Sequence, residues 1–395
     1  MKLKFYILWF SLGLVACKGF TGEKTDLSFI EQPVGANELV ALIPIQPPLS
    51  GFMTLSDVCA GFDELLYVVD AGNEEIKSFD QSGRLLGTLK LRGVTQVVQT
   101  RNLDLLAAGR LDTFINGTLF SLPTIYRIRL INGSLYGLAH AIIQNKVVHP
   151  LYFRTSVSAT DTAVSFRDIG VLADNSYYVV RNGNNNAISQ IGGPEDNILK
   201  FSGADVFLSP VNVQTQAGLY ADYFRRPLSL ATRAQPPQSP IINASGDFIV
   251  GMADPGAAFK LQYIRYISTN DGASYEVQTS FLTADYTKAD GAAGQPNRFA
   301  RPVAVTITGD GSNLVFVADQ DKDSVYQFLL NGLEGVTPPP GAESNRYVKI
   351  SFGGTGSGLT QFRQPSALAW LNKTLYVADV GNGRVCRYKL STDFR

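Results

Sequence analysis

The sequence is poor in the side chains that most often hold metals or form cross-links. Its 395 residues include 3 cysteines and only 2 histidines, His140 and His149. Two histidines cannot build a three-histidine metal site, and no Gly-x-Ser-x-Gly motif marks a nucleophilic serine. These absences disfavour a histidine-type metallolyase and a serine hydrolase.

Net charge is lacking as well. The chain carries 34 Lys+Arg against 34 Asp+Glu, which removes the electrostatic case for nucleic acid or an acidic membrane surface as the main partner. Charged residues make up 17% of the chain, below the roughly 25% usual in soluble domains. The 45% apolar content excludes intrinsic disorder, and 37 glycines with 11% aromatics favour sheets and turns.

The N-terminal apolar run, residues 5–16, is too short for a membrane-spanning helix. It has the length of a signal-peptide core, and Lys2 and Lys4 precede it as the charged region that such a peptide needs. The run is followed by Cys17, and Leu14-Val15-Ala16-Cys17 resembles the bacterial lipobox.

This resemblance implies a lipoprotein signal peptide over 1–16 and a chain lipidated on Cys17. Residues 17–37 then form a lipidated N-terminus and polar tether. The residue after Cys17 is Lys18 and not Asp, which favours sorting of the lipoprotein to the outer membrane of the cell envelope. An ordinary secretory signal with an incidental cysteine is the alternative.

Export leaves the pairing of Cys59 and Cys386 open. The envelope permits disulfides, so a bond between them is one alternative. Both cysteines lie in apolar, strand-like stretches, where a free cysteine packs as a small hydrophobe. We favour free thiols.

The body of the chain contains repeats. Three segments read Phe-x-x-Pro followed by apolar alternation, beginning at Phe224, Phe299 and Phe362. A second signature is an apolar run closed by an aspartate, at Asp70, Asp319 and Asp379. A turn and another alternating run follow each aspartate, so each unit predicts strands joined by hairpins.

These units resemble the NHL repeat family of β-propellers. The pattern is clearest in residues 353–385, which combine a Gly-rich lead, Gln364-Pro365 and Tyr376-Val377-Ala378-Asp379. The resemblance implies an all-β fold, a six-bladed β-propeller of four-stranded antiparallel blades over 38–395. Six second-strand anchors give the blade count: Tyr67, Leu106, Tyr178, Phe248, Phe316 and Tyr376.

Closure of the ring supplies a separate expectation. The final unit stops after its third strand, whereas residues 38–45 are strand-like and have no blade of their own. We predict that this N-terminal strand pairs with the last blade. Pro44 is acceptable there because an outermost strand leaves one edge unpaired.

The aspartates that close the repeated runs are candidate ligand-binding residues at one rim of the ring. The alternative for Asp70, Asp319 and Asp379 is a structural role, because aspartate stabilises tight turns through backbone N–H groups. Arg110 and Arg181 occupy the same position in two degenerate blades. If all five turns share a rim, that rim carries both charges and suits a polar ligand.

Asp319, Asp321 and Asp323 alternate as the first ligands of a Ca²⁺ loop do. The pattern then fails, because Ser324 stands in place of the glycine and Leu330 in place of the bidentate glutamate. A Ca²⁺ site and a solvated hairpin tip therefore remain as alternatives, and we expect no other cofactor.

Two functions remain open. The first is a non-enzymatic binding or scaffold module, a monomer that takes an envelope protein, peptide or glycan. The second is a metal-dependent hydrolase or lyase with its site at the channel mouth. Propellers host many unrelated activities, so the fold alone does not decide between them.

Overall fold

The computed structural model describes residues 40–150, 154–189, 193–236, 245–270 and 272–394. The predicted signal peptide, Cys17 and the tether lie outside these residues. No helix among the described residues is long and apolar enough to cross a membrane.

The described chain folds as a six-bladed β-propeller, as the repeats predict. Blades 1 to 3 take their strands in chain order from the innermost outwards. Blade 1 contains β2 (Leu55–Ala60), β3 (Leu66–Asp70), β4 (Glu75–Phe79) and β5 (Leu85–Lys90). Blade 2 contains β6 (Gln96–Gln99), β7 (Leu105–Ile115), β8 (Thr118–Arg129) and β11 (Ile142–Val148). Blade 3 contains β12 (Ser165–Val171), β13 (Tyr177–Asn182), β14 (Asn197–Phe201) and β15 (Phe207–Pro210).

Blades 4 to 6 complete the ring. Blade 4 contains β18 (Pro227–Thr232), β19 (Phe248–Met252), β20 (Leu261–Thr269) and β21 (Gly272–Val277). Blade 5 contains β22 (Pro302–Ile307), β23 (Leu314–Asp319), β24 (Ser324–Leu329) and β25 (Phe352–Gly353). Blade 6 contains β26 (Pro365–Leu371), β27 (Thr374–Asp379), β28 (Arg384–Leu390) and β1 (Leu42–Ser50).

The remaining elements are short. Two hairpins lie outside the four-stranded pattern. One contains β9 (Ile131–Asn132) and β10 (Leu135–Tyr136), and the other contains β16 (Val213–Thr215) and β17 (Gly218–Tyr220). In the second hairpin, β16 pairs in parallel with β21 and so extends blade 4. Six 3₁₀ turns are described: η2 (Leu138–His140), η3 (Ala159–Ala163), η4 (Thr279–Leu282), η5 (Gln320–Lys322), η6 (Val380–Asn382) and η7 (Ser391–Phe394).

The second strand of each blade is the most hydrophobic because blades pack against it on both faces. Every residue of β3, β19 and β23 is buried, and this burial includes the aspartates that end β3 and β23. A strand covered on both faces loses the in-out alternation of a one-sided sheet. All six predicted anchors lie on these second strands.

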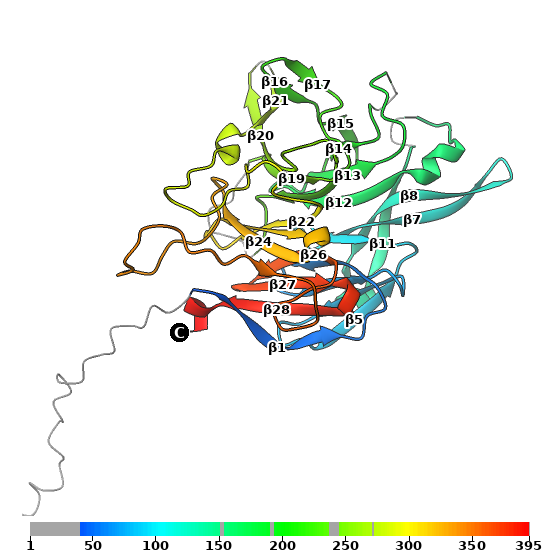
Figure 1. Cartoon of the computed structure of the whole chain (residues 1–395). Helices are drawn as coiled ribbons and strands as arrows, with labels where there is room; N and C mark the ends of the chain where they lie inside the picture. The colour runs from blue at the N-terminus through cyan, green and yellow to red at the C-terminus, as the bar shows by residue number, and fades with distance from the viewer. Residues whose placement is uncertain (1–39, 151–153, 190–192, 237–244, 271, 395) are drawn as a thin grey trace, which may run out of the picture. The chain divides into compact units, whose positions relative to one another are not determined.

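The ring closes through strands from opposite ends of the chain. β1 runs antiparallel to β28 in blade 6, and the pairing extends from Leu42 opposite Leu390 to Ser50 opposite Arg384. Figure 1 shows this blue strand beside the red ones. Pro44 lies opposite Tyr388 on the outer edge of the sheet, as predicted.

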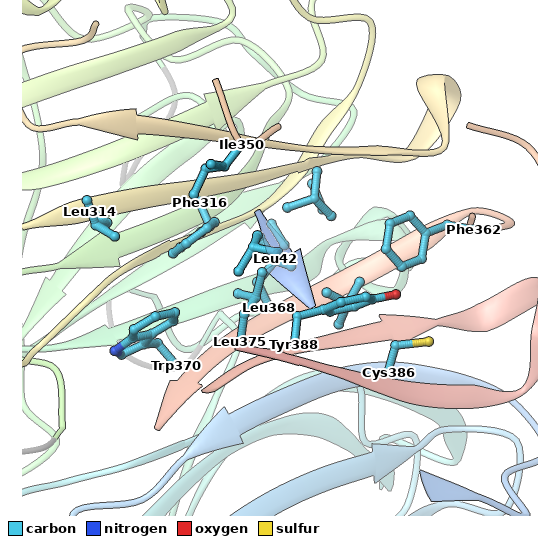
Figure 2. Close-up of a cluster of buried hydrophobic side chains, with 14 of the residues drawn as sticks. Leu42, Leu314, Phe316, Ile350, Phe362, Leu368, Trp370, Leu375, Cys386 and Tyr388 are labelled. Carbon is cyan, nitrogen blue, oxygen red and sulfur yellow. The ribbon is translucent and has the colours of Figure 1, made fainter. Parts of the chain in front are cut away.

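A hydrophobic cluster between blades 5 and 6 secures this closure. Leu42 of β1 packs with Phe316 of blade 5 and with Leu375 and Tyr388 of blade 6, as Figure 2 shows. The rings of Phe316 and Trp370 stack with centroids 5.4 Å apart. One side chain from the N-terminal strand thus completes a core built by the last two blades.

The innermost strands share one irregularity. In blades 1, 3, 4, 5 and 6 the pairing between the first and second strands shifts by one residue near the start of the first strand. A bulge of this kind bends the strand and re-aims the side chain at the extra position. Those positions are Ser56, Arg167, Leu228, Val303 and Ser366.

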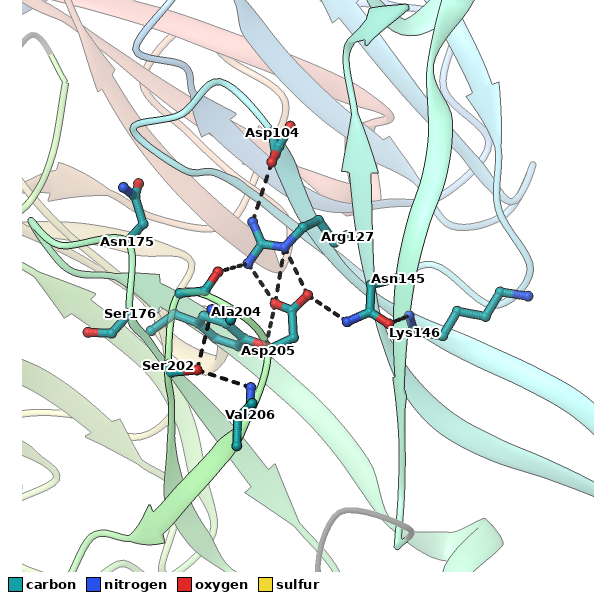
Figure 3. A network of polar contacts seen from close by, with 12 residues as sticks. Asp104, Arg127, Asn145, Lys146, Asn175, Ser176, Ser202, Ala204, Asp205 and Val206 are labelled. Carbon is teal, nitrogen blue, oxygen red and sulfur yellow. Dashed lines mark hydrogen bonds and ion pairs between the residues drawn. The ribbon is translucent and has the colours of Figure 1, made fainter.

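An ion pair joins blades 2 and 3. Arg127 of β8 donates two hydrogen bonds to the Asp205 carboxylate, Nε to Oδ2 at 2.9 Å and Nη2 to Oδ1 at 2.6 Å. Asn145 and Tyr177 also donate to Asp205, as drawn in part in Figure 3. Arg127 and Asp205 are both almost fully buried, so each charge depends on the other.

Replacing Leu42 by Ala tests the closure. Leu42 is buried and lines the cluster, so its truncation should lower the free energy of unfolding by about 2–5 kcal/mol. Ile43→Ala is the matched control, because Ile43 is 40% exposed on the same strand. Urea denaturation followed by fluorescence measures both, and equal losses from the two variants would argue against closure by Leu42.

Replacing Asp205 by Asn tests the blade 2–3 ion pair. The change removes the closer of the two carboxylates that pair with the buried Arg127 cation and leaves Asp104 at 3.6 Å. The loss of these charge-assisted hydrogen bonds should cost about 1.5–3 kcal/mol of stability at neutral pH. Burial alone would raise the pKa of Asp205, but hydrogen bonds from Arg127 and Asn145 outweigh it and lower the pKa. The contribution of Asp205 is therefore present above the unfolded-state pKa and lost as the pH falls through the lower, folded-state pKa.

As the pH falls from neutral to about 3, the free energies of unfolding of wild type and Asp205→Asn should therefore converge. Asp222→Asn is the control, because the Arg225 side chain that pairs with Asp222 is 67% exposed and such pairs contribute about 0–1 kcal/mol. A gap that stays constant at acidic pH would contradict this account of Asp205.

Candidate functional site

The five predicted rim residues lie at the same end of their blades. Asp70 pairs with Leu55, Asp319 with Pro302 and Asp379 with Pro365, each opposite the start of an innermost strand. Arg181 pairs with Phe166 in the same way. Arg110 lies two residues beyond Ala108, which pairs with the first residue of β6. By this register the five residues lie at one rim of the ring.

At this rim the aspartates are buried and bind the chain itself. The Asp70 carboxylate accepts from the backbone N–H groups of Met53 and Thr54 and from Lys77 Nζ at 2.9 Å. Burial opposes its ionisation, but these donors, led by the Thr54 N–H, lower the pKa of Asp70 to about 2. Asp379 likewise accepts from the Arg363 N–H and from Arg384 Nε. Each carboxylate stabilises the segment that leads into the innermost strand of its own blade.

The two arginines at this rim are also bound within the fold. Arg181 is fully buried and donates to the carbonyl oxygens of Glu195 and Pro194. Arg110 donates to the carbonyl oxygens of Ser121 and Thr162. Burial lowers the pKa of Arg110, yet arginine keeps its charge throughout the physiological range.

The three carboxylates of the suggested Ca²⁺ loop have different surroundings. Asp319 accepts from the backbone N–H groups of Ala300 and Arg301. Asp323 accepts from the Gln364 N–H and the Thr355 hydroxyl, and Asp321 is exposed. Among the described residues there is no group of three or more His, Cys, Asp or Glu placed to hold a metal ion.

The remaining candidates for catalysis lie apart. Cys59 and Cys386 are free thiols, as favoured from the sequence, and each packs against a hydrophobic cluster. His149 is buried 3.3 Å from Asp161, and burial lowers the pKa of its imidazole to about 4. His140 lies on the exposed turn η2.

A groove opens on the same rim over blades 3, 4 and 5. It consists of two cavities, of about 850 and 350 Å³, which share four wall residues, Asn186, Asp196, Arg226 and Pro255. Both volumes fall in the range of about 300–1,000 Å³ that small-molecule sites occupy. None of the five predicted rim residues lines this groove, but Asp321 does.

Three arginines from successive blades line the larger cavity. Arg167 occupies the bulge of β12, Arg226 directly precedes β18 and Arg301 directly precedes β22. All three side chains are exposed to solvent. Lys260 adds a fourth cation and donates to the Ala300 carbonyl at 2.9 Å.

The backbone beneath these arginines is held by buried carboxylates. Asp319 accepts from the Arg301 N–H at 3.0 Å, and Asp196 accepts from the Arg226 N–H at 3.0 Å. The predicted site residue Asp319 thus acts as a positioning residue for a groove residue. Sequence reasoning missed the arginines, although the residue before proline in the Phe-x-x-Pro repeat is Arg226 in blade 4, Arg301 in blade 5 and Gln364 in blade 6.

The axial channel is a second feature and is much narrower. Residues of all six innermost strands line a space of about 60 Å³. Asp57 of β2 accepts from the Val97 N–H of the next blade at 2.8 Å, and Asp168 of β12 accepts from the Leu230 N–H of the next blade at 2.7 Å. These carboxylates join neighbouring blades by satisfying backbone donors at strand edges.

Both channel carboxyl groups are hard to ionise. Burial raises the pKa of Asp57 to about 7, even though two backbone N–H donors lower it. Burial, and next the charge of Asp57, raise the pKa of Asp168 well above its usual value. The channel therefore favours the protonated forms of these groups in mildly acidic solution.

Comparison with known proteins places the fold but no family. No family model matches the sequence, and no curated protein matches it. Solved structures do. A protein of unknown function from Bacteroides thetaiotaomicron matches with a TM-score of 0.51 and 12% identity over 87% of this chain and 72% of the other. A PQQ-bound aldose sugar dehydrogenase from Streptomyces coelicolor matches with a TM-score of 0.52 and 10% identity over 89% and 98%.

A third similar structure is an auxiliary nutrient binding protein from Bacteroides thetaiotaomicron, with a TM-score of 0.50 and 10% identity over 86% of this chain and 70% of the other. At these identities the similarity shows the propeller fold alone. An enzyme and a binding protein share it, so the function has to be argued from the groove.

Replacing Asp57 by Asn tests the channel. Because the folded-state pKa is about 7 against an ordinary value of 3.8, the native state holds this proton more tightly than the unfolded state does. The contribution of Asp57 is therefore full below about pH 4 and is lost as the pH rises to about 7, by a few kcal/mol at most.

Asn has the shape of Asp but cannot accept from both N–H donors. At acidic pH the free energy of unfolding of the variant should be about 1 kcal/mol lower than that of wild type. As the pH rises, it should fall less than that of wild type. Urea unfolding at several pH values measures this slope, and a slope equal to that of wild type would contradict the assignment.

Proposed function

We propose that this chain is a non-enzymatic binding module of the bacterial cell envelope, held at a membrane by a lipid on Cys17. Its ligand is an envelope protein, peptide or glycan. The groove over blades 3 to 5 is the binding site. The NHL-type repeats and the lipobox-like segment 14–17 support this proposal from the sequence alone.

The observation that carries the proposal is the position and make-up of the groove. Its two cavities lie where the segments that precede β18 and β22 meet β12, the innermost strand of blade 3. The walls are backbone segments held by the buried carboxylates Asp196 and Asp319. A site on such a preformed frame binds without a large ordering cost.

The chemistry of the groove favours binding over catalysis. Its larger cavity is lined by cations, amides, apolar side chains and the carboxylates of Asp196 and Asp321, with Ser165 as its one hydroxyl among the described lining residues. No histidine or cysteine lies among those residues. The Asp196 carboxylate is already bound by the Gly183 and Arg226 N–H groups. Arginines and amides orient a ligand by hydrogen bonds but do not serve as a nucleophile or general base at neutral pH.

Filling the groove tests this function. Ala163 is exposed and lines the larger cavity, so Ala163→Trp places a large side chain in the site. Ala273→Trp is the matched control, because Ala273 is exposed on β21 and lines neither cavity.

The full-length, lipidated protein would be immobilised in detergent and incubated with an extract of envelope proteins and glycans. Mass spectrometry of the retained material should show ligand on wild type and on Ala273→Trp, and at least a tenfold loss on Ala163→Trp. Equal retention by Ala163→Trp and wild type would place the binding site elsewhere.

A further inference from the structure

The larger cavity concentrates positive charge that the chain itself does not neutralise. Arg167, Arg226, Arg301 and Lys260 line it, against the carboxylates of Asp196 and Asp321. Within the described part of the chain, none of the three arginines forms an ion pair. Arg167 donates to the Asn182 side-chain oxygen at 3.2 Å, which leaves most of its N–H groups available.

One of these two carboxylates, that of Asp196, is already bound by N–H groups of the chain. Asp196 accepts from the Gly183 N–H and Asn182 Nδ2 through Oδ1, and from the Arg226 N–H through Oδ2. It therefore holds the backbone in place rather than pairing with a guanidinium group. Asp321 is exposed on the wall of the cavity.

Arg167 and Arg301 repel one another. Burial, and next the charge of Arg301, lower the pKa of the Arg167 guanidinium. Arginine remains ionised despite such a shift, so the cation stays and its unfavourable surroundings destabilise the empty groove. An anion bound between the guanidinium groups would remove this repulsion.

The fold does not require these cations. At the bulge that Arg167 occupies in blade 3, blades 1 and 6 have Ser56 and Ser366 and blade 5 has Val303. Before the proline that opens the innermost strand, blade 6 has Gln364 where blade 4 has Arg226, and both residues have a positive φ, of 53° and 47°. Neutral residues thus occupy the positions of Arg167 and Arg226 in other blades, so the fold does not need a cation there.

Recognition by charge fits the rest of the lining. No aromatic side chain lies among the described residues that line the larger cavity, so it has no surface on which the apolar face of a neutral sugar stacks. The other polar residues of the wall are amides and one hydroxyl, Ser165. Guanidinium groups match carboxylate, sulfate and phosphate, which accept two parallel hydrogen bonds each.

We infer that the larger cavity binds a ligand carrying at least two oxyanion groups, one held by Arg167 and Arg301 and the other by Arg226. This inference rests on the proposed role of the groove and adds the chemical class of its ligand. The same chemistry occurs in small polycarboxylic or phosphorylated acids and in acidic oligosaccharides.

Calorimetry on the full-length protein in detergent tests the inference with four probes. Citrate represents the small acids, oligogalacturonate the acidic saccharides, inorganic phosphate a single oxyanion and a malto-oligosaccharide the neutral sugars. Citrate or oligogalacturonate should bind, more tightly than phosphate and more weakly as salt is added. Whichever of the two binds more tightly identifies the source of the oxyanions.

Arg226→Gln and Arg301→Gln should each weaken binding by roughly tenfold or more, because each removes a charge-assisted hydrogen bond. Arg265→Gln is the control, since Arg265 is exposed on β20 and lines neither cavity. Thermal unfolding supplies a readout that is independent of the ligand. Arg301→Gln should unfold at the same or a higher temperature than wild type and lose the stabilisation that the anion gives.

Three results would overturn the inference: no binding of either polyanion, equal binding of the malto-oligosaccharide, or an equal loss in Arg265→Gln. Failure here is distinct from failure of the proposed function. If Ala163→Trp abolishes capture but no polyanion binds, the groove remains the site and the oxyanion class is wrong. If polyanions bind through the arginines while Ala163→Trp retains its ligand, the charge site stands and the proposed function falls.

Discussion

The pairing of β1 with β28 is the interaction on which the rest of this structure depends. The second strand of each blade packs between the two neighbouring blades. In an open ring, an apolar face of the last blade would therefore be exposed to solvent. β1 supplies both the fourth strand of blade 6 and the Leu42 side chain, which packs in the core between blades 5 and 6. Because the two strands lie over 300 residues apart in the chain, as Leu42 and Leu390 do, closure makes the ring one cooperative unit.

Closure also creates the axis. The six innermost strands meet around this axis, and each has one edge without a strand partner. Side chains form hydrogen bonds with some of the backbone N–H and C=O groups on those edges. Asp57 and Asp168 accept from backbone N–H groups of the next blade, and Ser229 donates to the Pro302 carbonyl. These three residues occupy the same position after the bulge in blades 1, 3 and 4. The bulge thus places one residue to join blades and the preceding one, Arg167 in blade 3, to line the larger cavity of the groove.

The repeats made much of this fold predictable. Six apolar second-strand anchors gave the number of blades, and a spare strand before the first blade indicated how the ring closes. The aspartates were harder to interpret. Asp319 has the residue type of a ligand-binding site, yet its burial and its bonds to the Ala300 and Arg301 N–H groups show a positioning role. A local pattern identifies a turn, but burial decides what its carboxylate does.

The sequence by itself determined the all-β fold, the number of blades and the strand that closes them, because its repeated strand signatures resemble those of a propeller family and one spare strand precedes the first repeat. The groove was decided by tertiary structure alone. Arg167, Arg226 and Arg301 lie about 60 to 130 residues apart in the chain, and each looks like an ordinary variable position of its own repeat. Only the radial arrangement of blades brings them to one cavity, because a propeller places the starts of successive innermost strands side by side at one rim.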